Sequence, residues 1–142
     1  MKAFQTSRDI PVLPVNIFAA FSNPESLAKW WGPNGFSNTF NQFQFKPEGK
    51  WTFVMHGPDG VNYPNESEFI EIVPNEKVVI RHHSQPNFTL TVTLKSSGKG
   101  TTINWLQEFD NEDVAKNIAH IVESGNDQNL DRLTTLVCGI KL

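Results

Sequence analysis

The chain has 142 residues, enough for one domain, and carries 12 Lys and Arg against 15 Asp and Glu, a net charge of −3. This balance argues against a surface for nucleic acids or anionic membranes, because both require clustered positive charge. No stretch approaches the roughly 18 apolar residues of a membrane span, and residues 1–8 lack the apolar core of a signal peptide. The single cysteine, Cys138, cannot form an internal disulfide, which suits a reducing compartment. We therefore expect one cytoplasmic domain over residues 1–142, with no nucleic-acid partner and no membrane insertion.

The first 36 residues predict one strand followed by two short helices. Alternation over residues 4–12 favours a strand that two prolines bring to an end. Residues 15–21 have the apolar spacing of a helix. Asn23 is then a typical N-cap for a second helix, and Gly32 with the proline after it stops that helix near residue 31.

Residues 36–109 contain only strand patterns separated by turns. Phe40 and Phe43 fall out of alternation with one another, which predicts a β-bulge near residues 41–42 and a curved sheet. The expected strands cover residues 36–45, 51–56, 65–73, 78–84, 88–95 and 101–109.

From Asp110 onward the pattern is helical. Asp110 is the expected N-cap, and Gly125 predicts a kink or break before a last helix of about 15–17 residues. A single antiparallel sheet with helices on one face is an α+β architecture. A strongly bulged sheet of this kind would curl around the terminal helix.

Four segments carry a resemblance to a known family. Residues 10–36 ("IPVLPVNIFAAFSNPESLAKWWGPNGF") resemble the opening of START-like (SRPBCC superfamily) domains. Residues 53–82 are similar to the strand–turn–strand centre of the branch named for the activator of heat-shock protein 90 ATPase, C-terminal-domain type. Residues 87–109 are similar to its last two strands, and residues 127–133 to its helical ending. The resemblance covers about the whole chain.

This resemblance implies a helix-grip fold. In that fold a curved antiparallel sheet of about six to seven strands wraps around a long C-terminal helix, two short helices follow the first strand, and a cavity lies between sheet and helix. Members of the superfamily bind lipids, hormones and polyketides, and some are cyclases or other enzymes. The family name comes from a two-domain co-chaperone whose separate N-terminal domain makes much of the chaperone contact, and 142 residues are too few to include that domain.

The two adjacent tryptophans admit two interpretations. In a helix-grip fold Trp30 and Trp31 either form an aromatic lid over the cavity mouth or anchor a helix too short to be stable alone. Aromatic stripes on the strands can likewise be core or cavity wall. The apolar candidates for ligand contact are Trp30, Trp31, Phe36, Phe40, Trp51, Phe53, Met55, Trp105, Leu130 and Leu133.

The polar candidates for ligand contact are Glu66, His82 and His83. Glu66 and Glu68 share a strand phase with apolar residues, so either they face the cavity with raised pKa values or a bulge turns them outward. His82 and His83 point to opposite faces of one strand and cannot easily share a metal ion, although an inward histidine beside Glu66 could form an acid–base pair. Arg132 is either a solvated helix residue or a partner for a ligand carboxylate. The sequence predicts no metal and no cofactor.

Three functions remain open at this stage. The first is binding of a small apolar molecule, a lipid or aromatic metabolite, in an internal cavity. The second is an enzyme of cyclase, isomerase or hydrolase type in the same cavity, which requires a buried titratable residue. The third is a chaperone-modulating interaction domain, which predicts a filled interior and an exposed apolar patch. A homodimer is compatible with all three.

Overall fold

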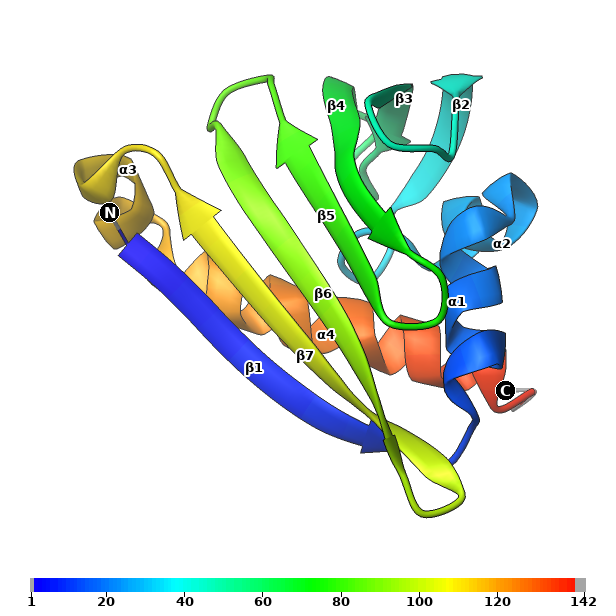
Figure 1. Ribbon diagram of the computed structural model, residues 1–142. Helices are drawn as coiled ribbons and strands as arrows, with labels where there is room; N and C mark the ends of the chain where they lie inside the picture. The colour runs from blue at the N-terminus through cyan, green and yellow to red at the C-terminus, as the bar shows by residue number, and fades with distance from the viewer. Residues whose placement is uncertain (1, 140–142) are drawn as a thin grey trace.

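Residues 2–139 are described in the computed structural model, and they form one antiparallel sheet of seven strands with helices (Figure 1). The strand order across the sheet is β1-β7-β6-β5-β4-β3-β2, with every neighbouring pair antiparallel. The elements follow in the order β1 (Lys2–Ile10), α1 (Pro14–Ser22), α2 (Pro24–Trp30), β2 (Ser37–Phe43), β3 (Gly49–His56), β4 (Asn62–Val73), β5 (Lys77–His82), β6 (Phe88–Ser97), β7 (Gly100–Phe109), α3 (Glu112–Asn117) and α4 (Ala119–Val137). This is the helix-grip arrangement that the sequence predicts.

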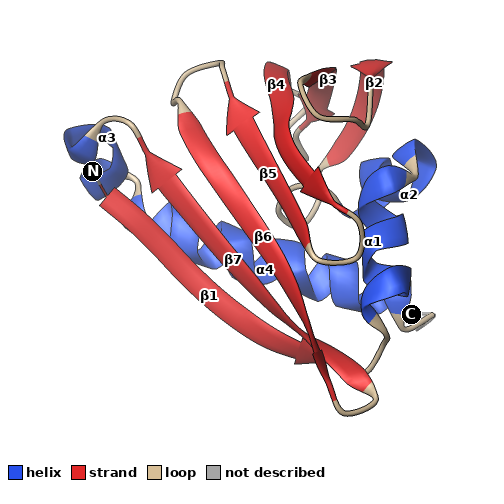
Figure 2. Cartoon of the chain, in the orientation of Figure 1, coloured by secondary structure: helices blue, strands red, loops and turns tan. Residues whose placement is uncertain are grey.

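The longest helix, α4, lies across one face of the sheet, and α1 and α2 pack beside one of its ends (Figures 1 and 2). Its residues Leu130 and Leu133 are completely buried. They join a core in which the aromatic side chains of several strands meet the two short helices. Burial of this apolar area is the main force that holds the helix against the sheet.

Two β-bulges shape the strands at the β2 side of the sheet. The first shifts the β2–β3 register between Phe40 and Gln42, where the sequence predicts it. The second shifts the β4–β5 register between Phe69 and Glu71. Because a bulge increases local twist and bends the strand, these two positions contribute to the curvature of the sheet around α4.

Two expectations about the C-terminal third are wrong. Asn111, and not Asp110, caps α3, accepting a hydrogen bond from the backbone N–H of Val114 at 3.0 Å. The helical segment breaks at Ile118, and α4 then runs without interruption through Gly125. A glycine costs a helix only about 1 kcal/mol relative to alanine, and the packing of α4 on the sheet outweighs that cost.

Within residues 2–139, no helix is long and apolar enough to cross a membrane.

Candidate functional site

A cavity of about 250 Å³ lies between the sheet and α4. Its walls come from five strands, from the segment after α2 and from one side of α4. Aromatic and aliphatic side chains predominate, and none of the lining residues is Asp, Glu, Lys or Arg. The lining residues are Trp31, Gly32, Pro33, Phe53, Met55, Asn65, His82, Phe88, Leu90, Trp105, Gln107, Ile121, Val122, Gly125, Asn126 and Asn129.

The alternation of side chains along the strands determines which of them form the sheet side, or floor, of the cavity. Phe53 and Met55 face inward from β3 together with Trp51, as their spacing predicts, because successive side chains of a strand point to opposite faces. Cross-strand pairing extends the floor: His82 pairs with Phe88, and Leu90 pairs with Gln107. Residues from distant parts of the sequence therefore meet on one concave surface.

His82 is the buried titratable group of this floor, and only 8% of its surface is exposed. Its Nε2 lies 2.6 Å from Asn65 Oδ1 and its Nδ1 lies 3.1 Å from the carbonyl oxygen of Pro86. The Phe88 ring stacks on the imidazole with a centroid distance of 4.5 Å. Burial lowers the pKa of His82, and the hydrogen bond to Pro86 offsets this only in part. Both ring nitrogens lie within hydrogen-bond distance of an oxygen atom, so the imidazole is held in place from two sides.

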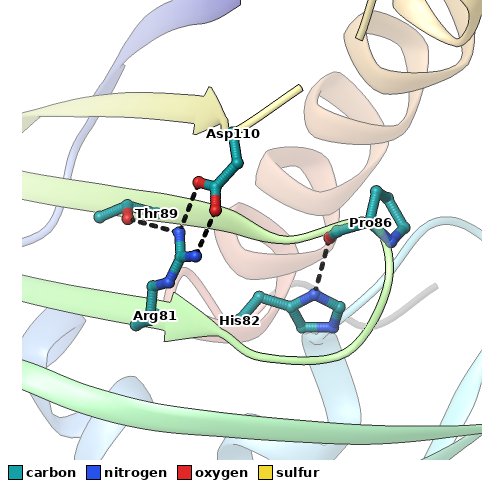
Figure 3. A network of polar contacts seen from close by, with 5 residues as sticks. All are labelled: Arg81, His82, Pro86, Thr89 and Asp110. Carbon is teal, nitrogen blue, oxygen red and sulfur yellow. Dashed lines mark hydrogen bonds and ion pairs between the residues drawn. The ribbon is translucent and has the colours of Figure 1, made fainter. Parts of the chain in front are cut away.

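The neighbouring Arg81 points the other way (Figure 3). Its guanidinium binds both carboxylate oxygens of Asp110, one of them at 2.8 Å, and contacts the hydroxyl of Thr89 at 3.3 Å. This ion pair lowers the pKa of Asp110. The charge at this end of β5 is thus held outside the cavity, while His82 faces into it.

The α4 side of the cavity has three features. Asn126 donates a hydrogen bond from Nδ2 to Oε1 of Gln107 at 3.1 Å, which ties the helix to β7. At Gly125, an added Cβ would meet no heavy atom within 4 Å, so the helix backbone borders open space there. Ile121 lines the cavity although 62% of its surface is exposed, which marks the side where the cavity reaches solvent.

The two tryptophans of α2 have separate roles in the structure. Trp30 is 1% exposed, and its indole N–H donates to the carbonyl oxygen of Ala20 at 3.0 Å, so it anchors α2 on α1. Trp31 is 8% exposed and lines the cavity. Trp30 therefore fits the anchor interpretation, whereas Trp31 is a buried part of the cavity wall and its role as a lid stays a prediction.

Gly32 closes α2 in the left-handed conformation that the sequence predicts, with φ of +99°. An added Cβ would lie 2.7 Å from Cε of Met55, so a side chain at this position would also push against the cavity wall. The positive φ is what requires glycine at this position, because Met55 Cε is the end of a flexible side chain and can move away.

Arg132 organises the cavity wall that follows α2, a role that sequence reasoning missed. The Nη1 and Nη2 atoms of its guanidinium lie 2.7 to 3.2 Å from five backbone carbonyl oxygens, and the three acceptors of Nη1 share its two hydrogens. The acceptors are the carbonyl groups of Lys29, Trp31, Gly32, Pro33 and Phe36. A short helix leaves its last carbonyls without partners, and a cation at that end is favourable. Arg132 is neither a solvated residue nor directed at a ligand carboxylate.

Asn129 and Asn38 complete the same set of contacts. Asn129 donates to the carbonyl of Trp30 at 2.8 Å, and Asn38 donates to the carbonyls of Ala28 and Trp31 at 3.0 and 2.9 Å. The end of α2 is therefore fixed by side chains from α4 and β2, and the position of Trp31 depends on them.

The remaining sequence candidates lie outside the cavity lining. Trp30, Trp51, Leu130 and Leu133 are buried in the core, and Phe40 packs against that core. Phe36 instead contacts the ring of Tyr63, with a centroid distance of 6.0 Å.

The polar candidates Glu66 and His83 also lie away from the cavity. Glu66 is exposed and His83 pairs with Glu68 at 3.1 Å on the outer face. Glu66 and Glu68 face outward although they share an alternation pattern with Ile72, which packs against the core. The bulge after Phe69 explains this, because it reverses the direction of the side chains that follow. The acid–base pair of an inward histidine with Glu66, which the sequence left open, is not formed, because Asn65 contacts His82 instead. No group of three or more His, Cys, Asp or Glu side chains in residues 2–139 is arranged to hold a metal ion.

A curved seven-stranded sheet that grips a C-terminal helix over an apolar cavity defines a helix-grip, START-like protein. A family model described as activator of Hsp90 ATPase homolog 1-like protein matches residues 12–137. The chain belongs to this family, as the resemblance of its sequence segments predicts.

Solved structures agree on the fold. A protein from Nitrosomonas europaea is 19% identical with a TM-score of 0.89, covering 96% of this chain and 94% of its own. A protein from Chromobacterium violaceum is 21% identical with a TM-score of 0.85, covering 96% and 97%. A protein from Silicibacter pomeroyi that bears the name AHSA1 is 19% identical with a TM-score of 0.79, covering 99% and 100%. No curated protein sequence matches the chain.

Proposed function

We propose that this protein binds a small, neutral and mainly apolar molecule in the cavity between the sheet and α4. The observation that carries the proposal is a cavity of about 250 Å³ with a largely apolar lining and no charged side chain. Such a pocket, with a few polar groups among apolar walls, is the usual form of a small-molecule site. A ligand with a net charge would lose its hydration there without gaining an opposite charge.

The size and the polar groups narrow the class of ligand. Pockets for drug-sized ligands usually enclose roughly 300–1,000 Å³, whereas about 150 Å³ suffices for benzene. A molecule with one or two rings, or a short aliphatic chain, therefore fits. Gln107 accepts from Asn126 through Oε1, and its Nε2 can donate a hydrogen bond to one hydroxyl or carbonyl group of a ligand.

Open space beside Gly125 supports the same proposal. A glycine inside a helix costs about 1 kcal/mol relative to alanine, and nothing in the packing around Gly125 excludes a side chain. The space beneath α4 is thus kept at the expense of helix stability. It also favours ligand binding over the interaction-domain hypothesis, which expects a filled interior.

The test is to fill this space. In Gly125→Leu, the new side chain extends from α4 into the cavity, so binding of 1-octanol and 2-naphthol, measured by titration calorimetry, should be lost. The free energy of unfolding should hold or rise because leucine is a better helix former. Ser124→Leu is the matched control, because Ser124 lies immediately before Gly125 in the same helix and is exposed. Equal binding by the wild type and Gly125→Leu would refute the proposed site.

A further inference from the structure

A second hollow lies next to the cavity, and the hydrogen-bonded pair of Gln107 and Asn126 stands between the two spaces. This hollow encloses about 360 Å³ between β1 and α4 and is open to solvent along part of its length. Asn126 lines both spaces, whereas Gln107 lines the cavity alone. The residues around the second hollow are Ala3, Phe4, Gln5, Thr6, Ala119, Glu123, Asn126 and Asp127.

The sheet register locates the boundary between the two spaces. Phe4 pairs with Gln107, and Gln107 pairs with Leu90, so the three residues form a row across β1, β7 and β6. Phe4 lines the second hollow and Leu90 lines the cavity, while Gln107 lies between them. The boundary therefore runs through the position of Gln107 on the sheet.

The helix provides the other half of the boundary. Asn126 follows Gly125 on α4, where Gly125 faces the cavity, and Glu123 and Asp127 face the second hollow. Asn126 lies between these two sides of the helix and reaches Gln107 with a 3.1 Å hydrogen bond. One hydrogen bond between two neutral amides thus spans from helix to sheet where the two spaces meet.

We propose that the Gln107–Asn126 pair is an end wall that limits the length of the ligand. The proposal rests on the proposed function and names a specificity determinant of the same site. With the wall in place, a linear ligand has the cavity of about 250 Å³. Without it, the chain can continue into the hollow of about 360 Å³, which more than doubles the space. Glu123 and Asp127 border that extension, so it suits a neutral chain and disfavours a carboxylate.

The experiment is a chain-length series of primary alcohols from 1-hexanol to 1-dodecanol, with binding measured by titration calorimetry. Each methylene group that becomes buried should strengthen binding by roughly fourfold. For the wild type, this gain stops at the length that fills the cavity. For Asn126→Ala, it should continue for at least two more methylene groups, giving at least tenfold tighter binding of the longer alcohols than the wild type shows.

Two further variants separate the wall from other effects. Asn126→Leu keeps a bulky side chain in the gap without the hydrogen bond, and the length limit should stay as in the wild type. Asp127→Ala widens the second hollow but leaves the wall, so it should not move the limit either. Thermal unfolding checks that each variant is folded.

The outcomes are distinct. A limit that moves to longer alcohols in Asn126→Ala alone supports the wall. An unchanged limit in Asn126→Ala, with short alcohols still bound, overturns the wall and leaves the proposed function in place. Absence of binding of every alcohol by every protein overturns both.

Discussion

Replacement of Arg132 by methionine should weaken the protein far more than loss of a surface arginine does. Arg132 makes hydrogen-bond contacts with five carbonyl groups of α2 and of the cavity wall after it. Methionine retains most of the apolar length of the side chain but none of its donors. Arg8→Met is the matched control, because Arg8 pairs with Asp131 at 2.6 Å where the two side chains are 27% and 65% exposed.

The expected magnitude follows from the contacts. A hydrogen bond involving a charged group contributes about 1.5–3 kcal/mol. The five bonds of Arg132 share two nitrogen atoms, and the side chain is only half-buried, so water replaces part of what is lost. We expect a loss of roughly 2–4 kcal/mol in the free energy of unfolding, or about 5–15 °C in Tm. Arg8→Met should cost at most about 1 kcal/mol.

Urea unfolding followed by tryptophan fluorescence measures both variants in the same way. Arg132→Lys adds a second comparison, since an ammonium group keeps the charge but cannot reach five carbonyls in the plane of a guanidinium. It should recover less than half of the loss. If Arg132→Met and Arg8→Met are equally stable, the carbonyl contacts do not hold the end of α2 and the reasoning is refuted.

The remaining predictions concern pH and the paired tryptophans. Because burial lowers the pKa of His82 below its unfolded value near 6.5, the unfolded chain binds more protons, and stability should fall as the pH drops below about 6.5. His82→Gln should flatten this dependence in urea unfolding between pH 5 and pH 7, and an identical slope in the variant would exclude His82 as its source. Trp30→Phe removes the hydrogen bond to Ala20 and should cost roughly 1–3 kcal/mol with little effect on 1-octanol binding. Trp31→Phe should change 1-octanol affinity more than stability, and the reverse pattern in calorimetry and unfolding would reject the separate roles.

Local patterns predicted most of the fold because they act over a few residues. The alternation of Trp51, Phe53 and Met55 placed these side chains on one face of β3, and the lost phase between Phe40 and Phe43 located the first bulge. These signals depend on strand period and do not need a partner from a distant segment.

The features missed in the site depend on contacts between distant segments. Arg132 lies about 100 residues from the carbonyls that it binds, and nothing in the helical pattern around it distinguishes it from a solvated arginine. Gly125 suggests a break locally, yet packing keeps α4 continuous, and its open surroundings emerge only when the helix lies over the sheet. One signal was available: a seven-residue helix needs partners for its last carbonyl groups, and basic and amide side chains elsewhere in the chain are candidates to supply them.

The most direct test of the central claim is an NMR titration of the protein with 1-octanol, observing the side-chain amide groups. If the cavity holds the ligand, the signals of Asn65, Gln107 and Asn126 should move in a saturable way. The side-chain amide of Gln44, which is exposed and accepts from the backbone N–H of Lys50 at 3.1 Å, lines neither space and should keep its shift. A shift confined to Gln44, or none at any amide up to the solubility limit of 1-octanol, would contradict ligand binding between the sheet and α4.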